Sequence, residues 1–327
     1  MIDNFLLNKR VLFIAPNFYQ YHTGIIKAME NKGAIVTYIP EVNNSILYRF
    51  SKKINTGLQQ FLERKQKSKF LSICSESSFE ILFVIRGELL DKKCIDDIRR
   101  RLPQAEFYMY QWDSYLHSDY REVINSFKSV STFDYNDANE LSIPCVPLFY
   151  LPEYENRAIN VKKEYALSFF GAYHGDRLNV IKFYSLNLDI HALSYRLHLY
   201  IPVLSFVFRL IIGELTFSDI RYLSFRTTNS TDINTTYKES VAVLDIELSI
   251  QSGLSIRTFE VLKSGAKLIT TNINVKNEPF YDASVIRCID RGYLEFDAGF
   301  FLESPPEDVN LDDYSVSKWL GKIFTTK

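Results

Sequence analysis

The chain has 327 residues, long enough for two domains of about 150 residues each. A hydrophobic fraction of 46% and an aromatic fraction of 15% are typical of a globular protein with well-filled cores. The net charge of −1 argues against nucleic acid as a partner, because such surfaces carry excess Lys and Arg. The four cysteines are widely spaced and form no CxxC pair, so we expect no zinc site or disulfide framework and a cytoplasmic location.

The first half of the chain alternates between apolar runs and helical patterns. Arg10–Ala15 is predicted to be the first strand. Its apolar core is too short for a signal peptide. Further strands are predicted at Ala34–Ile39, Phe79–Arg86, Glu106–Gln111, Ser129–Phe133 and Cys145–Leu148, and helices at Gly24–Lys32, Asn43–Ser68 and Asp91–Arg101. Repeated strand–helix units predict a doubly wound parallel sheet.

The polar, proline-containing segment 151–163 is a candidate linker to a second domain of the same class. We therefore expect domains at 1–152 and 164–310, and a short amphipathic helix within 311–327. The second sheet is predicted to begin at Tyr165–Phe170.

Leu197–Phe217 is a long apolar run interrupted by Pro202, Arg209, Gly213 and Glu214. Because a membrane-spanning helix needs roughly 20 residues with few charges, we do not expect it to cross a membrane. A buried helical pair is the favoured interpretation. The alternative is a surface through which the protein contacts the inner membrane peripherally.

Leu244–Asn272 has the pattern strand, polar loop, helix, strand. Arg257 and Glu260 are three positions apart and project from neighbouring turns of the helix. Gly253 allows close backbone approach, and free N–H groups at the helix start favour a phosphate. A cation and a carboxylate beside such a turn suit a nucleotide. The alternative is an ordinary surface ion pair between the two side chains.

Within this segment, Glu260–Thr271 (EVLKSGAKLITT) resembles the E-A-x-A-x-G-x-P-V-I-x-T segment of GT-B glycosyltransferases. The pattern Q-x-G-L-x-x-R-T-F-E at 251–260 is similar to that of a bacterial subgroup associated with lipopolysaccharide and capsule synthesis. Two shorter stretches, Tyr110–Ser114 and Ser129–Ala138, resemble the same subgroup.

The resemblance implies an α/β fold of two Rossmann-like domains facing a cleft, with the terminal helix returning to the first domain. It implies a nucleotide-sugar donor as substrate, with no cofactor and no metal. The glutamate at Glu260 would hold the donor's ribose, while Gly253, Leu254 and Arg257 would meet its phosphates. Ser252 stands where retaining members often have a second glutamate, so the stereochemical outcome stays open.

The loop after the first strand of the second domain carries Gly171, His174 and Arg177. Glycines with two basic side chains at a strand-to-helix turn suit a diphosphate. The alternative is a glycine-rich connection in which Asp176 or Arg177 pairs locally.

Asp113 follows a predicted strand, at the edge where open α/β sheets bind ligands. It could act as a general base on an acceptor hydroxyl, or simply cap the next turn. Glu247, Thr271 and Asn272 are expected at the corresponding edge of the second sheet. Asp245 shares a strand face with Glu247, but we favour a cleft role for Glu247 over metal binding.

The resulting hypothesis is a metal-independent glycosyltransferase of bacterial surface polysaccharide assembly, catalytic through Asp113, Glu247 and Arg257. Its acceptor would be a saccharide or a lipid-linked saccharide. The alternative is a non-catalytic two-domain protein that binds a nucleotide or sugar. A dehydrogenase or epimerase of Rossmann type ranks last, because no G-x-G-x-x-G follows the first strand.

Overall fold

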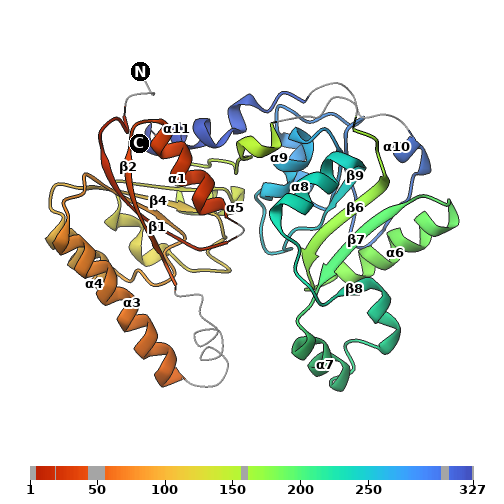
Figure 1. Cartoon of the computed structure of the whole chain (residues 1–327), viewed down its shortest axis with the longest axis horizontal. Helices are drawn as coiled ribbons and strands as arrows, with labels where there is room; N and C mark the ends of the chain where they lie inside the picture. The colour runs from red at the N-terminus through yellow and green to blue at the C-terminus, as the bar shows by residue number, and fades with distance from the viewer. Residues whose placement is uncertain (1–4, 19, 43–55, 156–160, 303–308, 326–327) are drawn as a thin grey trace. The chain divides into compact units, whose positions relative to one another are not determined.

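The computed structural model describes residues 5–18, 20–42, 56–155, 161–302 and 309–325 (Figure 1). The chain divides into two compact units. Unit 1 comprises residues 1–149, 250–253 and 313–327, and unit 2 comprises residues 150–249 and 254–312. The short segment 250–253 therefore packs with unit 1, although both its neighbours in sequence pack with unit 2.

Unit 1 contains a five-stranded parallel sheet in the order β2-β1-β3-β4-β5. Its strands are β1 (Arg10–Ala15), β2 (Ile35–Pro40), β3 (Ile81–Ile85), β4 (Glu106–Gln111) and β5 (Ser129–Thr132). The chain leaves β1 for β2 on one side and returns to β3 on the other. This reversal is the switch point at which open α/β sheets bind ligands.

Helices cover both faces of the unit 1 sheet. They are α1 (Tyr21–Asn31), α3 (Thr56–Glu76), α4 (Lys92–Arg101), α5 (Tyr135–Leu141) and α11 (Val316–Thr325). α3 and α4 lie side by side and bury Phe70 and Ile95 against one face (Figure 1). On the other face the terminal helix α11 packs beside α1, and its Trp319 ring lies 4.8 Å from the ring of Tyr110.

Unit 2 contains a six-stranded parallel sheet in the order β11-β10-β9-β6-β7-β8. Its strands are β6 (Tyr165–Ala172), β7 (Tyr195–Tyr200), β8 (Leu223–Ser224), β9 (Ser240–Asp245), β10 (Lys267–Thr270) and β11 (Ile286–Cys288). Its helices are α6 (Arg177–Ile190), α7 (Val203–Ile211), α8 (Ser230–Glu239), α9 (Ile256–Lys263) and α10 (Ala298–Leu302). Side chains of α6 and α10 share one hydrophobic core with alternate residues of β9, whereas α8 and α9 contact the sheet from the opposite face.

Two parallel, helix-covered sheets confirm the predicted fold class. Most predicted strands lie within a residue or two of the observed ones. Cys145–Leu148 is the exception, since it contributes only an isolated bridge between Cys145 and Thr132. Of the helix predicted at Asn43–Ser68, residues 43–55 lie outside the described part of the chain, and α3 begins at Thr56.

The buried helical pair predicted at Leu197–Phe217 is wrong. Residues 195–200 form β7, in which Leu199 is buried, and Pro202 then caps α7. Proline disfavours a helical conformation in the residue before it, so the apolar run is split into a strand and a separate helix. Among the helices that the structure describes, none is long and apolar enough to cross a membrane.

Candidate functional site

Four loops of unit 2 leave the adjacent strands β6, β9, β10 and β11 at the same end of the sheet, and we call this place the unit 2 edge. The loop after β6 carries His174 and leads into α6. Glu247 lies two residues beyond the end of β9. Thr271 directly follows β10, and Arg291 lies beyond β11. Parallel strands bring these loops together because all of them leave the same end of the sheet.

Arg291 ties three of these loops together. Its guanidinium donates to both carboxylate oxygens of Asp176 at 2.7 and 2.9 Å. It also donates to the carbonyl and the carboxylate of Glu247 at 2.7 and 2.9 Å, and to the hydroxyl of Thr271 at 3.0 Å. The Thr271 hydroxyl in turn donates to Glu247. Sequence reasoning missed Arg291, since nothing in the local sequence marks it.

Glu247 is buried at this edge, and burial raises the pKa of its carboxyl above the ordinary value, while Thr271 and Arg291 act in the opposite direction. Asp245 lies nearby but has different partners, Ser255, Arg257 and Thr258. Among the described residues there is no group of acids, histidines and cysteines arranged to hold a metal ion.

Arg257 is largely enclosed, with 18% of its side chain exposed. Its guanidinium forms an ion pair with Asp245 at 2.7 Å and donates to the Phe170 carbonyl at 2.6 Å. A weaker bond at 3.3 Å reaches the hydroxyl of Tyr237. The predicted surface pair with Glu260 is therefore not the arrangement seen, because Arg257 pairs with the strand residue Asp245. This ion pair fixes the start of α9 against β9.

Arg177 has a different environment. It is 9% exposed, and its guanidinium donates only to main-chain carbonyls, those of Ile246 at 2.8 and 2.5 Å and of Ala172 at 3.0 Å. No carboxylate among the described residues pairs with it. Burial, together with the nearby Arg257, lowers the pKa of Arg177 to about 10. Enclosing a cation without a carboxylate partner is costly, and such a cation favours an anionic ligand.

His174 lies in the same loop as Arg177. Burial, and then the charge of Arg177, lowers the pKa of His174 to about 4, so its imidazole is neutral at pH 7. Gly171 precedes it, and a Cβ at this position would lie 2.6 Å from the Phe169 ring and 3.3 Å from the Arg177 guanidinium. Glycine at position 171 thus leaves room for the two side chains that build the loop.

The glycine turn before α9 is held by a carboxylate. The N–H groups of Ser252 and Gly253 donate to the Asp134 carboxylate at 2.6 and 3.3 Å, and the Ser252 hydroxyl donates to it at 2.6 Å. A Cβ at Gly253 would lie 2.4 Å from the Phe133 carbonyl oxygen. The N–H groups of Ser252 and Gly253 are thus engaged by the Asp134 carboxylate, and the glycine is required by close packing. A phosphate at the N–H groups that begin α9, from Ile256 on, stays a prediction.

The remaining predicted donor residues are buried in unit 2. Leu254 and Glu260 are 2% and 3% exposed, and Asn272 uses its side chain to accept the N–H of Asn274 at 3.1 Å. A ribose contact of Glu260 stays a prediction.

In unit 1, Asp113 lies beyond the end of β4. Burial raises the pKa of its carboxyl, and Arg86 acts in the opposite direction. Its carboxylate accepts a long hydrogen bond, 3.4 Å, from the side chain of Gln251. No backbone N–H of the described residues donates to it, so the geometry does not support the alternative that Asp113 is a cap. The turn after Asp113 is held instead by Asp137, which accepts from the hydroxyl of Ser114 and the N–H of Tyr115, both at 2.8 Å.

Arg86 and Glu41 are further residues at this edge that sequence reasoning missed. Arg86 follows β3 with a left-handed φ of 67°, a conformation that is strained for a non-glycine residue. Its Nε donates to the buried Glu41 at 2.7 Å, and its carbonyl accepts from Gln111 at 2.8 Å. The available signal was that Glu41 and Arg86 each directly follow an apolar strand. Their ion pair places a fixed cation near Asp113.

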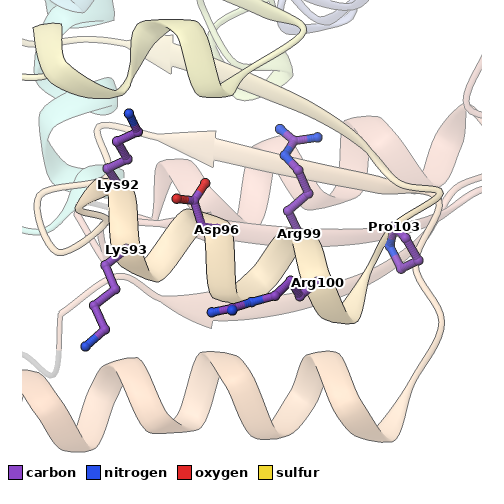
Figure 2. Close-up of a pocket in the computed structure, with 6 residues that line it drawn as sticks. All are labelled: Lys92, Lys93, Asp96, Arg99, Arg100 and Pro103. Atoms are coloured by element: carbon purple, nitrogen blue, oxygen red, sulfur yellow. The ribbon is translucent and has the colours of Figure 1, made fainter.

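A shallow pocket lies along α4, lined by Lys92, Lys93, Asp96, Arg99, Arg100 and Pro103 (Figure 2). It contains none of the residues predicted or observed at the two strand edges. Arg99 lies over the Phe107 ring at 4.1 Å and Arg100 pairs with Asp97, so these cations are partly engaged by their own unit.

No protein-family model matches the chain, and no curated protein matches it. Solved structures match it over nearly its whole length. The lipopolysaccharide outer core galactosyltransferase WaaB, in its apo form, aligns with a TM-score of 0.52 and 13% identity, covering 96% of this chain and 98% of that one. The trehalose-6-phosphate phosphatase N-terminal domain of Candida albicans aligns with a TM-score of 0.60 and 9% identity. The alignment covers 98% of this chain and 97% of that one.

A third match is the UDP-GlcNAc 2-epimerase of Methanocaldococcus jannaschii, in complex with UDP-GlcNAc and UDP. Its TM-score is 0.52 at 11% identity, with 97% of this chain and 99% of that chain covered. The chain has the GT-B fold. Because transferases and epimerases share the GT-B fold, the fold by itself does not select the reaction.

The pKa of His174 predicts how the stability of unit 2 depends on pH. Its folded value of about 4 lies below the ordinary 6.5, so the unfolded chain binds the proton first as the pH falls. Stability should therefore rise with pH from about 4 to 6.5, with no further contribution above that range. His174→Asn should flatten this slope in denaturation measured across the window by circular dichroism. His191→Asn, at an exposed position, is the control, and an equal flattening there would contradict the assignment.

Proposed function

We propose that the chain is a glycosyltransferase that binds a nucleotide-sugar donor at the unit 2 edge. The observation that carries the proposal is Arg177, an enclosed guanidinium that donates only to carbonyls. A diphosphate beside Arg177 would supply the missing negative charge, and the neutral imidazole of His174 can donate one further hydrogen bond. This is the group that a nucleotide-sugar donor carries and releases.

In this proposal Arg291 and Glu247 shape the donor site. Arg291 holds the loops after β6, β9 and β10 in place, and the Glu247 carboxylate, bound by Arg291 at one oxygen and by Thr271 at the other, would meet sugar hydroxyls with its remaining lone pairs. Glu260 would hold the ribose. Preformed positions of this kind lower the barrier because the groups need no reorganisation when charge develops on the leaving phosphate.

Unit 1 would supply the general base. Asp113 has the two properties that this role requires, since it is not engaged as a cap and burial raises the pKa of its carboxyl. The acceptor would be a saccharide or a lipid-linked saccharide of bacterial surface polysaccharide assembly. The support for this pathway is the 251–260 pattern together with the fold shared with a lipopolysaccharide galactosyltransferase.

The proposal is tested by thermal unfolding with UDP, GDP and CDP and with the corresponding nucleotide sugars. One nucleoside diphosphate should raise the unfolding temperature, because a ligand at 100 times its Kd contributes about 2.7 kcal/mol. Arg177→Gln should abolish that shift while keeping a fold at least as stable, since it removes an enclosed charge that forms no ion pair and still provides a donor for Ile246. Arg287→Gln, which removes a surface pair with Asp297, should leave the shift unchanged.

The competing functions predict different outcomes when the same protein is incubated with the nucleotides and nucleotide sugars. Binding without any consumption of the nucleotide sugar would identify a non-catalytic binding protein. Conversion of the sugar while it stays attached to the nucleotide would identify an epimerase, as in the Methanocaldococcus jannaschii neighbour. Absence of a shift with every nucleotide would overturn the donor site itself.

A further inference from the structure

Helix α7 belongs to unit 2 (Figure 1), and it presents an apolar face to solvent. Six side chains, each 45% to 83% exposed, make up this face: Val203, Leu204, Val207, Phe208, Ile211 and Ile212. They recur in adjacent pairs four positions apart, which places them along one side of the helix. None of the six carries a polar group.

The opposite side of α7 is anchored in unit 2. Phe206 is 6% exposed, belongs to the hydrophobic core shared with α6, and meets the ring of Phe225 at 5.3 Å. Leu210 packs against the same core. The exposed face is therefore held by a fixed helix. It continues into the 3-10 turn at Phe217–Tyr222, where Phe217 is 77% exposed.

Near this face the acidic side chains are paired, whereas two basic side chains are not. Asp219 is buried and paired with Lys182, and Glu214 is engaged by Arg209 and by the hydroxyl of Tyr173. Arg221 and Arg226 are exposed, and no carboxylate among the described residues pairs with either of them. An apolar face with basic side chains beside it matches the surface of an anionic bilayer.

We propose that α7 and the turn at Phe217–Tyr222 form a membrane-docking surface. The apolar face enters the boundary between headgroups and acyl chains, and Arg221 and Arg226 bind lipid phosphates. With nine residues, α7 lies in the plane of the interface. The proposal does not depend on the reaction at the unit 2 edge.

The exposure of these side chains favours lipid over a protein partner. Side chains such as Leu204 and Ile211, 83% and 78% exposed, stand out from the surface instead of lining a groove. A protein partner would need a complementary hollow to bury them, whereas acyl chains adapt to a convex face. A second copy of the chain would have to oppose two such convex faces, which leaves little well-packed area for a stable dimer.

The test is co-sedimentation of the full chain with phosphatidylcholine vesicles that contain about one-third phosphatidylglycerol, a source of the surface charge that attracts basic residues. Leu204→Ser/Ile211→Ser should weaken binding about tenfold or more, because two large aliphatic contacts with the bilayer are lost. The matched control is Leu186→Ser/Ile190→Ser, which removes two aliphatic side chains, 60% and 69% exposed, from α6 of the same unit. This control should bind as the wild type does.

A second variant tests the basic side chains. Arg221→Gln/Arg226→Gln should remove the preference for anionic over purely zwitterionic vesicles. The proposal would be overturned if the wild-type protein did not co-sediment with vesicles, or if the α7 variant bound them as well as the wild type does. Loss of binding only in Lys93→Glu/Arg100→Glu would overturn it too, because it would assign the docking to the basic pocket of α4. A concentration-dependent dimer that the α7 variant abolishes, seen by light scattering, would replace the bilayer with a second copy.

Discussion

Replacing Arg257 by methionine is expected to destabilise unit 2 by about 3–5 kcal/mol, the usual cost of breaking a buried ion pair from one side. The substitution leaves Asp245, 1% exposed, with only the hydroxyls of Ser255 and Thr258 as partners. It also removes the bond to the Phe170 carbonyl, which links α9 to the strand β6. Chemical denaturation followed by circular dichroism measures the loss.

The two units can be followed separately in this experiment. Both tryptophans, Trp112 and Trp319, lie in unit 1, so their fluorescence reports on that unit, while circular dichroism reports on the whole chain. We expect the circular dichroism transition of Arg257→Met to move to lower denaturant much further than the fluorescence transition.

A double variant supplies the control. Arg257→Met/Asp245→Leu removes both charges and should recover most of the lost stability, because the penalty arises from leaving one charge buried alone. If Arg257→Met were as stable as the wild type but no longer bound nucleotide, the ion pair would not be structural. The predicted role of Arg257 at the donor phosphates would then be strengthened.

Arg257 shows which features of the fold and the site could be predicted from the sequence and which could not. Buried parallel strands are continuous apolar runs, so β1 and β4 could be located to within one residue from the pattern of apolar residues. Helical spacing correctly put Arg257 and Glu260 on one helix. Spacing carries no information on burial, however, and the carboxylate that Arg257 meets is Asp245, which precedes the loop.

Contacts between distant loops were beyond sequence reasoning for the same reason. Arg291 meets Asp176 from a position 115 residues later in the chain, and Ser252 meets Asp134 from a position 118 residues later. Neither partner follows a local rule. The exposed face of α7 is the converse case, since composition alone suggested burial and only the packed structure shows which apolar residues lack a neighbour.

Asp113→Asn is expected to lower kcat by about 10²–10⁴-fold, the typical contribution of a general base. The same variant should be as stable as the wild type or more stable. Because burial raises the folded pKa of Asp113, the folded state binds more protons than the unfolded chain between the ordinary 3.8 and that raised value, so its stability falls as pH rises through this range. A neutral amide removes this penalty.

Loss of activity together with unchanged or higher stability separates a base from a structural carboxylate. Asp137 supplies the opposite behaviour, since it accepts from the hydroxyls of Ser114 and Tyr120 and from the N–H of Tyr115, and Asp137→Asn should destabilise unit 1. Asp119→Asn, at an exposed pair with Arg121, should change neither property.

The wild-type rate should also report the pKa of Asp113 directly. A base must be ionised, so kcat/KM should fall as the pH drops through the raised value, and Asp113→Asn should lack this acidic limb. Release of nucleoside diphosphate from the donor found by thermal unfolding measures both quantities. Wild-type turnover in Asp113→Asn, or an acidic limb that persists in it, would show that the acceptor proton leaves by another route. Arg86 would then be the remaining fixed charge near Asp113 that could steer it, because its ion pair with the buried Glu41 holds the guanidinium in place.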